Sequence, residues 1–257
     1  MKIERYIPGD SLRPFVKHYL IIDSESGMES RILPDSSIVM AFRCKGRVSY
    51  EEGGITNPLP VSVITGLRKS IRLLDYSKKT ATLLVAFHEG GAAAFFKEPL
   101  HELFGLHLGL DHLIRCSRLV EIEERLAEAT NNLQQISMVE QFLCSILKNP
   151  QLDPLILKAV QAIKSSHGDI RIKDLVTELP VSLDTFEKRF KRIIGASPKQ
   201  FLTIVRLRSL IERYPQAKSL TDAAVMAGYF DQAHFIKASK SFTGQTPTAF
   251  FNASPYW

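Results

Sequence analysis

Histidine and glutamate side chains occur side by side at two places in the sequence, where such pairs could bind a metal or transfer protons. His101 and Glu102 are adjacent, and His107 follows six residues after His101. A zinc-protease helix instead needs two histidines at i and i+4, on one face. His88 and Glu89 form the second pair, without the His-x-His that would complete a cupin metal site. The spacing therefore predicts no metal.

Signatures of other enzyme classes are also missing. The sequence contains no Gly-x-Ser-x-Gly, no Walker loop and no GxGxxG. Its three cysteines, Cys44, Cys116 and Cys144, are widely spaced and lack a CxxC pair, which favours buried free thiols over a disulfide framework. We therefore expect neither a catalytic site nor a cofactor.

A segment of the carboxy-terminal half occurs twice. GASPKQFL, which begins at Gly195, aligns with GQTPTAFF, which begins 49 residues later at Gly244. The same offset aligns Phe186 with Phe235, Lys188 with Lys237, and Lys191 with Lys240. A repeat at a fixed offset indicates two copies of one supersecondary unit.

Each copy predicts a short apolar helix, a tight turn and a second helix. Ser182 and Asp231 are suited to cap the second helices. In the first copy, Phe186 and Phe190 begin an apolar stripe, and charged residues occupy the other face. This arrangement is typical of a helix-turn-helix, whose second helix fits a major groove of DNA.

The net charge of +6 is confined to the same half of the chain. Residues 151–257 contain 15 basic and 9 acidic side chains, whereas residues 1–150 contain 18 of each. Clustered lysine and arginine favour a polyanionic partner, because they release counterions from phosphates. Charge alone would also fit an anionic membrane surface or a basic soluble domain.

The first ninety residues alternate short apolar stretches with turn signals. HYLIID, SIVMAF, VSVITG and TATLLVAF are typical of strands, and ESGMES and YEEGGITNPLP are typical of turns. This pattern predicts a mostly antiparallel barrel or sandwich. From Asp111 to Leu147 the apolar spacing becomes helical, which predicts two helices with a turn at Asn131 and Asn132.

Prolines in KNPQLDP favour a linker, so we expect two domains, over residues 1–150 and 155–257. No apolar run approaches the ~20 residues of a membrane span. The amino terminus does not resemble a secretory signal. The sequence therefore predicts a cytoplasmic protein without a membrane partner.

Two segments resemble the AraC family of bacterial transcriptional regulators: SLDTFEKRFKRIIGASPKQFLTIVRL and AAVMAGYFDQAHFIKASKSFTGQTPTAFF. The resemblance spans Ile170 to Phe251. It implies an α+β fold, with an amino-terminal antiparallel β-barrel (cupin-like) plus helices, then an all-α domain with two helix-turn-helix subdomains joined by a helix from Pro198 to Arg213. It also implies double-stranded DNA and RNA polymerase as partners.

The resemblance carries base-facing positions onto both second helices. They are Leu183, Asp184, Glu187 and Lys188 in the first helix, and Gln232, Ala233, Ile236 and Lys237 in the second. The phosphate candidates are Lys191, Arg192, His234 and Lys240. Gln232 can pair with adenine, and Lys188 can reach guanine. Pro180 stands where the family has glycine or asparagine, so the first turn must adopt another geometry.

The amino-terminal half resembles a sensor region that precedes this module in some regulators. LPDSS at Leu33 and FHEGGAAAFFKEPLHEL at Phe87 carry this likeness, although Ser36 replaces an expected glycine. It implies a small cupin-related barrel that can hold a small-molecule effector, followed by helices for a homodimer contact or for packing on the barrel. The alternative is a cupin-like enzyme or ligand-binding protein with an appended DNA-binding module.

Overall fold

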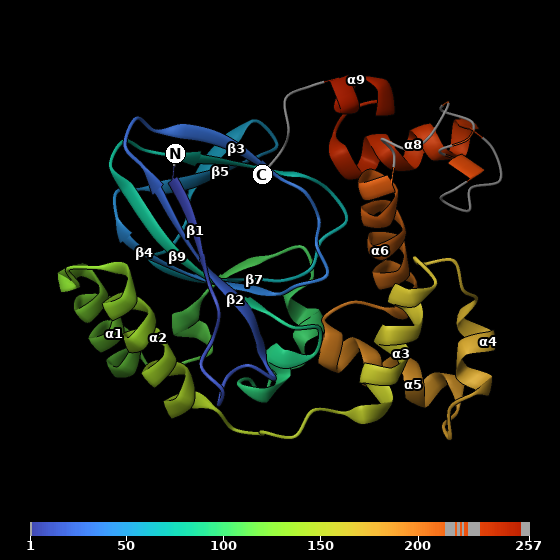
Figure 1. Cartoon of the computed structure of the whole chain (residues 1–257), viewed down its shortest axis with the longest axis horizontal. Helices are drawn as coiled ribbons and strands as arrows, with labels where there is room; N and C mark the ends of the chain where they lie inside the picture. Colours follow the sequence, from blue (N-terminus) through green and yellow to red (C-terminus); the bar gives the residue numbers. More distant parts are fainter. Residues whose placement is uncertain (1, 214–218, 220–221, 223, 226–231, 253–257) are drawn as a thin grey trace.

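The computed structural model describes residues 2–213, 219, 222, 224, 225 and 232–252 (Figure 1). Its strands are β1 (Lys2–Tyr6), β2 (Val16–Ser24), β3 (Met28–Ile32), β4 (Val39–Lys45), β5 (Val48–Glu52), β6 (Ile55–Pro58), β7 (Ser62–Thr65), β8 (Arg72–Tyr76), β9 (Thr80–Phe87) and β10 (His107–Gly109). Its helices are η1 (Gly91–Ala94), η2 (Leu100–Leu103), η3 (Leu110–His112), α1 (Cys116–Glu128), α2 (Asn132–Ile146), α3 (Pro154–Ser165), α4 (Ile172–Thr177), α5 (Leu183–Ile194), α6 (Pro198–Arg213), α8 (Gln232–Thr243) and α9 (Pro247–Asn252).

The strands form two antiparallel sheets. One has the order β1-β2-β9-β4-β7-β10 and the other the order β3-β8-β5-β6. Side chains of both sheets line one cavity between them. The predicted antiparallel α+β fold is confirmed. Closure into a single barrel needs one continuous hydrogen-bond ladder, and the described strands form two separate ladders instead.

Strand β9 lies in the middle of the larger sheet and is covered on both faces. Leu83, Val85 and Phe87 are fully buried in the main core, while Leu84 on the opposite face lines the cavity. Because neither face of the strand meets bulk water, its sequence is the continuous apolar run TATLLVAF rather than a strict alternation.

The two helices predicted between Asp111 and Leu147 are present as α1 and α2. Asn131 caps α2, and its side chain accepts a hydrogen bond from the backbone N of Gln134 at 3.0 Å. The apolar side of the pair packs on the larger sheet, where the rings of Phe42 and Phe142 meet edge to face at 5.8 Å. Packing within the chain therefore accounts for the apolar stripes.

The cysteines are free thiols, but the prediction that they are buried is wrong for two of them. Cys116 begins α1 and Cys144 lies on α2, and both are exposed. Leucines and other apolar residues of these helices fill the core instead. Cys44 is half-buried, and burial raises its pKa to about 11.

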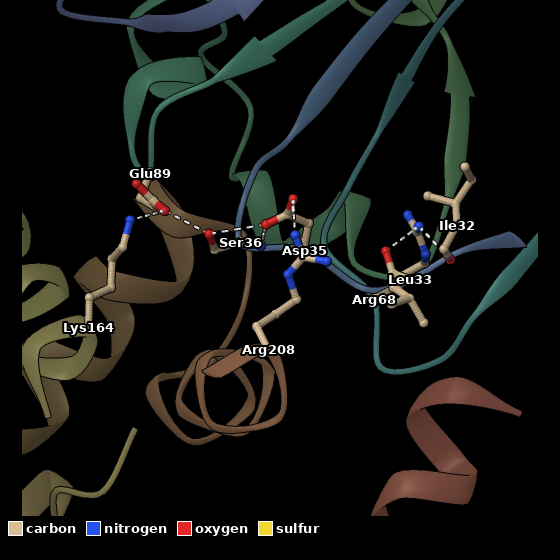
Figure 2. Close-up of polar contacts among 8 residues, drawn as sticks. All are labelled: Ile32, Leu33, Asp35, Ser36, Arg68, Glu89, Lys164 and Arg208. Carbon is tan, nitrogen blue, oxygen red and sulfur yellow. Dashed lines mark hydrogen bonds and ion pairs between the residues drawn. The ribbon is translucent and has the colours of Figure 1, made fainter. Parts of the chain in front are cut away.

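Charged side chains join the amino-terminal region (residues 2–146) to the carboxy-terminal region (residues 154–252), as Figure 2 shows. The buried Glu89 carboxylate accepts hydrogen bonds from Lys164 Nζ at 2.8 Å and from Ser36 Oγ at 2.6 Å. The carboxylate of Asp35 accepts a bond from Arg208 Nη2 at 3.3 Å. The two amino-terminal motifs thus meet each other, and they contact α3 and α6.

The predicted repeat is confirmed in the part of the chain that the structure describes. Helices α5 and α8 begin and end 49 residues apart, and so do the first residues of α6 and α9. Gly195 and Gly244, which follow α5 and α8, have φ of 87° and 77°. Glycine adopts this left-handed conformation without strain, so both helices end in the same way.

We expect the second helix-turn-helix unit (residues 224–252) to be less stable than the first (residues 172–201). Buried Ser239 takes the place that the buried Phe190 ring fills in the first unit. Losing one buried ring removes about 2 kcal/mol of apolar stabilisation, which Phe242 offsets in part. In native-state amide exchange, α8 should exchange faster than α5; equal or slower exchange in α8 would contradict this expectation.

Candidate nucleic-acid interface

The first helix-turn-helix unit consists of α4, a tight turn and α5. In the turn, the backbone N of Leu179 donates to Val176 O at 3.0 Å, and the N of Val181 donates to Leu179 O at 2.8 Å. No residue from 178 to 181 has a positive φ, so Pro180 fits without strain. Ser182 Oγ then accepts a bond from Thr185 N at 3.3 Å, which caps α5.

Helix α5 has one buried and one exposed face. Phe186, Phe190 and Ile194 are buried, which fixes the orientation of the helix. On the other face, Leu183, Asp184 and Lys188 are exposed, and Glu187 is half-buried. Lys188 Nζ lies 2.9 Å from the Asp184 carboxylate, and this hydrogen bond and the carboxylate charge raise the pKa of Lys188. The lysine is therefore a cation on the outer face.

A basic recess lies beside this face and contains side chains from both regions. Lys191 of α5, Lys199 of α6 and Lys69 of the β7–β8 connection line a hollow of about 530 Å³, and residues of α8 line it as well. Arg192 is exposed near the end of α5. Sequence reasoning did not select Lys69 or Lys199, because neither lies in a repeated position on a second helix.

In the second unit, α8 shows the same division into faces. Gln232, Ala233 and Lys237 are exposed, and Lys240 is exposed one turn later. Ile236 is half-buried and packs against the core. Asp231 and the side chain of His234 lie outside the described part of the chain. The described base-facing candidates of α8 therefore share one side of the helix, with Ile236 at its edge.

Helix α6 separates the two units. Figure 1 shows α4 and α5 near one end of α6 and α8 and α9 near the other. Its 16 residues span about 24 Å. Buried side chains along its length, including Phe201, Val205 and Leu210, anchor it in the core. The connection is therefore a packed helix rather than a flexible linker.

The described residues contain neither a metal-binding cluster nor a membrane-spanning helix. No group of three histidine, cysteine, aspartate or glutamate side chains is placed there to hold a metal ion. None of the described helices combines the length and the apolar character that a bilayer crossing requires.

Two family models match the chain. Residues 175–253 match a helix-turn-helix domain, and residues 4–109 match a domain of unknown function (DUF6597). The first match begins in α4 and ends after α9, so it covers both units. The second covers the two sheets from β1 to β10.

Curated relatives match over a part of their length. An uncharacterized HTH-type transcriptional regulator of Haemophilus influenzae is 29% identical over 117 residues, which are 45% of this chain and 38% of the relative. The uncharacterized HTH-type transcriptional regulator YidL of Escherichia coli K12 is 26% identical over 119 residues, 44% of this chain and 39% of the relative. The chain thus spans less than two-fifths of these relatives.

Solved structures show a looser likeness. ToxT from Vibrio cholerae O395 aligns over 93% of this chain and 97% of its own, with a TM-score of 0.46 and 13% identity. The AraC-like transcriptional activator CuxR aligns over 83% of this chain and 87% of its own, with a TM-score of 0.26 and 14% identity.

Two amphipathic second helices at a fixed offset, each with an exposed polar face, define a tandem helix-turn-helix protein. Within that class, the two repeated motifs, the helix-turn-helix domain that matches residues 175–253 and the related HTH-type regulators support an AraC-type regulator.

Proposed function

We propose that this chain is a sequence-specific transcriptional regulator that binds double-stranded DNA through α5 and α8. The observation that supports it most is the repeat itself: two helices with exposed polar faces, held apart by the packed helix α6. The proposed base-facing side chains are Leu183, Asp184, Glu187, Lys188, Gln232, Ala233, Ile236 and Lys237. Helices held in this way can enter successive major-groove segments about one turn, ~34 Å, apart.

Phosphate contacts would fix the position of the protein on the duplex without specifying sequence. We assign them to Lys191, Arg192, His234 and Lys240, and we add Lys69 and Lys199 because they line the same recess as Lys191. The backbone between the two groove segments would pass this recess.

Single substitutions separate the two kinds of contact. We expect Lys188→Ala to cost about 1–3 kcal/mol of affinity and to relax preference within one half of the site, because a base contact is lost. Lys199→Ala should weaken binding to all sequences and reduce the slope of log affinity against log salt by about 0.9, because one phosphate contact is lost. Electrophoretic mobility shifts at several salt concentrations measure both effects.

The matched control is Lys78→Ala, because Lys78 is exposed in the β8–β9 turn. It should change neither affinity nor salt slope. An unchanged slope in Lys199→Ala, or unchanged preference in Lys188→Ala, contradicts the assignment of that residue.

We further propose that a small molecule in the cavity between the sheets controls DNA binding. This proposal is supported by Arg208, which belongs to α6 yet lines the cavity and pairs with Asp35. A ligand in this cavity can change DNA affinity only if the protein has two arrangements of its amino-terminal and carboxy-terminal regions. The ligand must then bind one arrangement more tightly than the other. A screen in which ligands stabilise the protein without changing DNA affinity would refute effector control.

Two further partners are part of the proposal. A homodimer would use the outer surface of α1 and α2, where Val120 and Leu133 are exposed. RNA polymerase is the partner through which a bound regulator would act on transcription. Sedimentation with and without DNA tests the homodimer.

A further inference from the structure

The cavity between the two sheets has an apolar wall. Its volume is about 320 Å³, which lies within the range of small-molecule sites. The larger sheet contributes Leu20, Val39, Val63 and Leu84, and the smaller sheet contributes Val48 and Leu74. Most of a molecule seated there would touch hydrocarbon side chains.

Basic side chains gather at one place in this wall. Arg68 Nη2 donates to the backbone oxygens of Ile32 at 3.0 Å and Leu33 at 2.9 Å (Figure 2). Arg72 Nη2 donates to Gly105 O at 2.8 Å. These bonds hold both guanidinium groups at the cavity without neutralising their charge.

Aromatic and polar neighbours fix the rest of the cluster. The Arg72 guanidinium lies 5.7 Å from the centre of the Tyr50 ring. The Tyr50 ring is 4.9 Å from the ring of His107, and His107 Nδ1 lies 2.8 Å from Thr65 Oγ1. His107, Arg68 and Arg72 all line the cavity.

Three nitrogens of this cluster are buried without a hydrogen-bond partner among the described residues. They are Arg68 Nε, Arg72 Nη1 and His107 Nε2. An unsatisfied buried donor costs free energy, and more so when its group is charged. Each of the three atoms could donate to an anionic oxygen, because arginine carries only donors and either histidine nitrogen can carry a proton.

Among the described residues, no carboxylate forms an ion pair with Arg68 or Arg72. Asp35 and Glu52 are the carboxylates whose charge reaches Arg68 and Arg72, and Asp35 is paired with Arg208. Burial and the charges of Arg72 and Arg68 lower the pKa of His107 to about 3. The cluster is therefore positive, and it disfavours a further proton.

We propose that the cavity binds an apolar molecule that carries one anionic group, a carboxylate or a phosphate monoester, with the anion held by Arg68, Arg72 and His107. This inference rests on the proposed function, because it names the ligand class of the proposed effector cavity. Two guanidinium groups suit an anion with several oxygens, and the apolar wall suits an alkyl or aromatic body.

The ligand would also contact the DNA-binding region. Arg208 reaches the same cavity from α6, and its partner Asp35 lies in the cavity wall as well. An anion near this pair would compete with Asp35 for Arg208 or repel the Asp35 carboxylate. Either change alters how α6 is held against the amino-terminal region.

Calorimetric titration of the full chain with octanoate, octyl phosphate and 1-octanol tests the inference. We expect at least one of the two anions to bind at least tenfold more tightly than 1-octanol, and the comparison of octanoate with octyl phosphate shows which anion the site prefers. Octanol binding as tightly as both anions, or no binding of any probe, would overturn the proposal.

Substitutions of arginine residues in the cavity wall test which side chains bind the anionic group. Arg72→Gln should weaken anion binding at least tenfold and leave octanol binding unchanged, whereas Arg72→Lys, which keeps the charge, should retain part of the preference. Arg43→Gln is the matched control, since Arg43 also lines the cavity but lies away from the cluster. It is four residues along β4 from Val39, and Val39 is the residue that pairs with Thr65, the neighbour of His107. Loss of the preference in Arg43→Gln, and not in Arg72→Gln, would overturn the assignment.

Because the binding assay uses no DNA, it tests the ligand class of the cavity independently of the proposed regulator function. Anion binding without any DNA affinity supports the ligand class and contradicts the regulator function. Specific DNA binding without anion preference contradicts the ligand class alone.

Discussion

Phe190→Ala destabilises the carboxy-terminal region by about 3–5 kcal/mol and removes DNA binding. The Phe190 ring is fully buried, and it packs against Phe186 at 5.5 Å and Phe201 at 5.6 Å between ring centres. The ring therefore packs α5 against α6, and its removal leaves a cavity that the neighbouring side chains cannot fill. A loss of this size is a large share of the ~5–15 kcal/mol that stabilises a domain.

Urea denaturation followed by circular dichroism measures the loss, and mobility shifts measure DNA binding. Ile7→Ala serves as the control, because that side chain is 77% exposed and its loss should cost less than about 0.5 kcal/mol. A Phe190→Ala protein that unfolds at the wild-type urea concentration would show that the ring does not hold α5 in place.

Lys164→Met is expected to cost about 2–3 kcal/mol and to loosen the contact between the two regions. The substitution leaves Glu89, which is 8% exposed, with Ser36 as its remaining side-chain partner. Removing one member of a buried pair costs more than the pair contributes. The cost is below that of a fully buried pair because the Lys164 side chain is 46% exposed.

The pH dependence of the stability loss in Lys164→Met shows whether the Glu89 carboxylate causes it. Burial raises the pKa of Glu89, but hydrogen bonds from Lys164 and Ser36 outweigh it and hold the pKa below its ordinary value of 4.5. The stabilisation is therefore present above pH 4.5 and is lost as the pH falls through the depressed pKa. In Lys164→Met burial dominates and the pKa rises, so the difference from wild type should be largest near neutral pH and shrink in acid.

Denaturation of wild type, Lys164→Met, Glu89→Gln and the double variant at several pH values measures the coupling. Lys158→Met is the matched control, since Lys158 is exposed on the same helix. A difference between wild type and Lys164→Met that stays constant from pH 7 to pH 3 would rule out the Glu89 carboxylate as the cause.

The strongly patterned parts of the fold were predictable from the sequence. The stripe that includes Phe186 and Phe190, with the capping residue Ser182, predicted the start of α5, and Pro198 to Arg213 is the helix α6 as predicted. The apolar runs gave β2, β4, β7 and β9. In these elements, burial of one face or both dictates the residue types.

Other elements lacked such a signal. The pattern of ESGMES and YEEGGITNPLP predicts turns, but ESGMES contains the first part of β3, and YEEGGITNPLP contains most of the β5–β6 hairpin around Gly53 and Gly54. These strands are partly exposed, so polar residues such as Glu51 and Glu52 can occupy them and the apolar pattern of a buried strand is absent. The contacts of Glu89 and Asp35 join segments far apart in the chain, and the Arg68, Arg72 and His107 cluster depends on strand pairing. Hydrophobic periodicity predicts neither contacts between distant segments nor which strands pair.

Selection of bound duplexes from a random pool tests the central claim most directly. We predict enrichment of a site with two conserved elements about one helical turn, ~34 Å, apart, because α5 and α8 are held at opposite ends of α6. A pool that yields no motif, with binding that depends steeply on salt for every sequence, would contradict readout by two recognition helices.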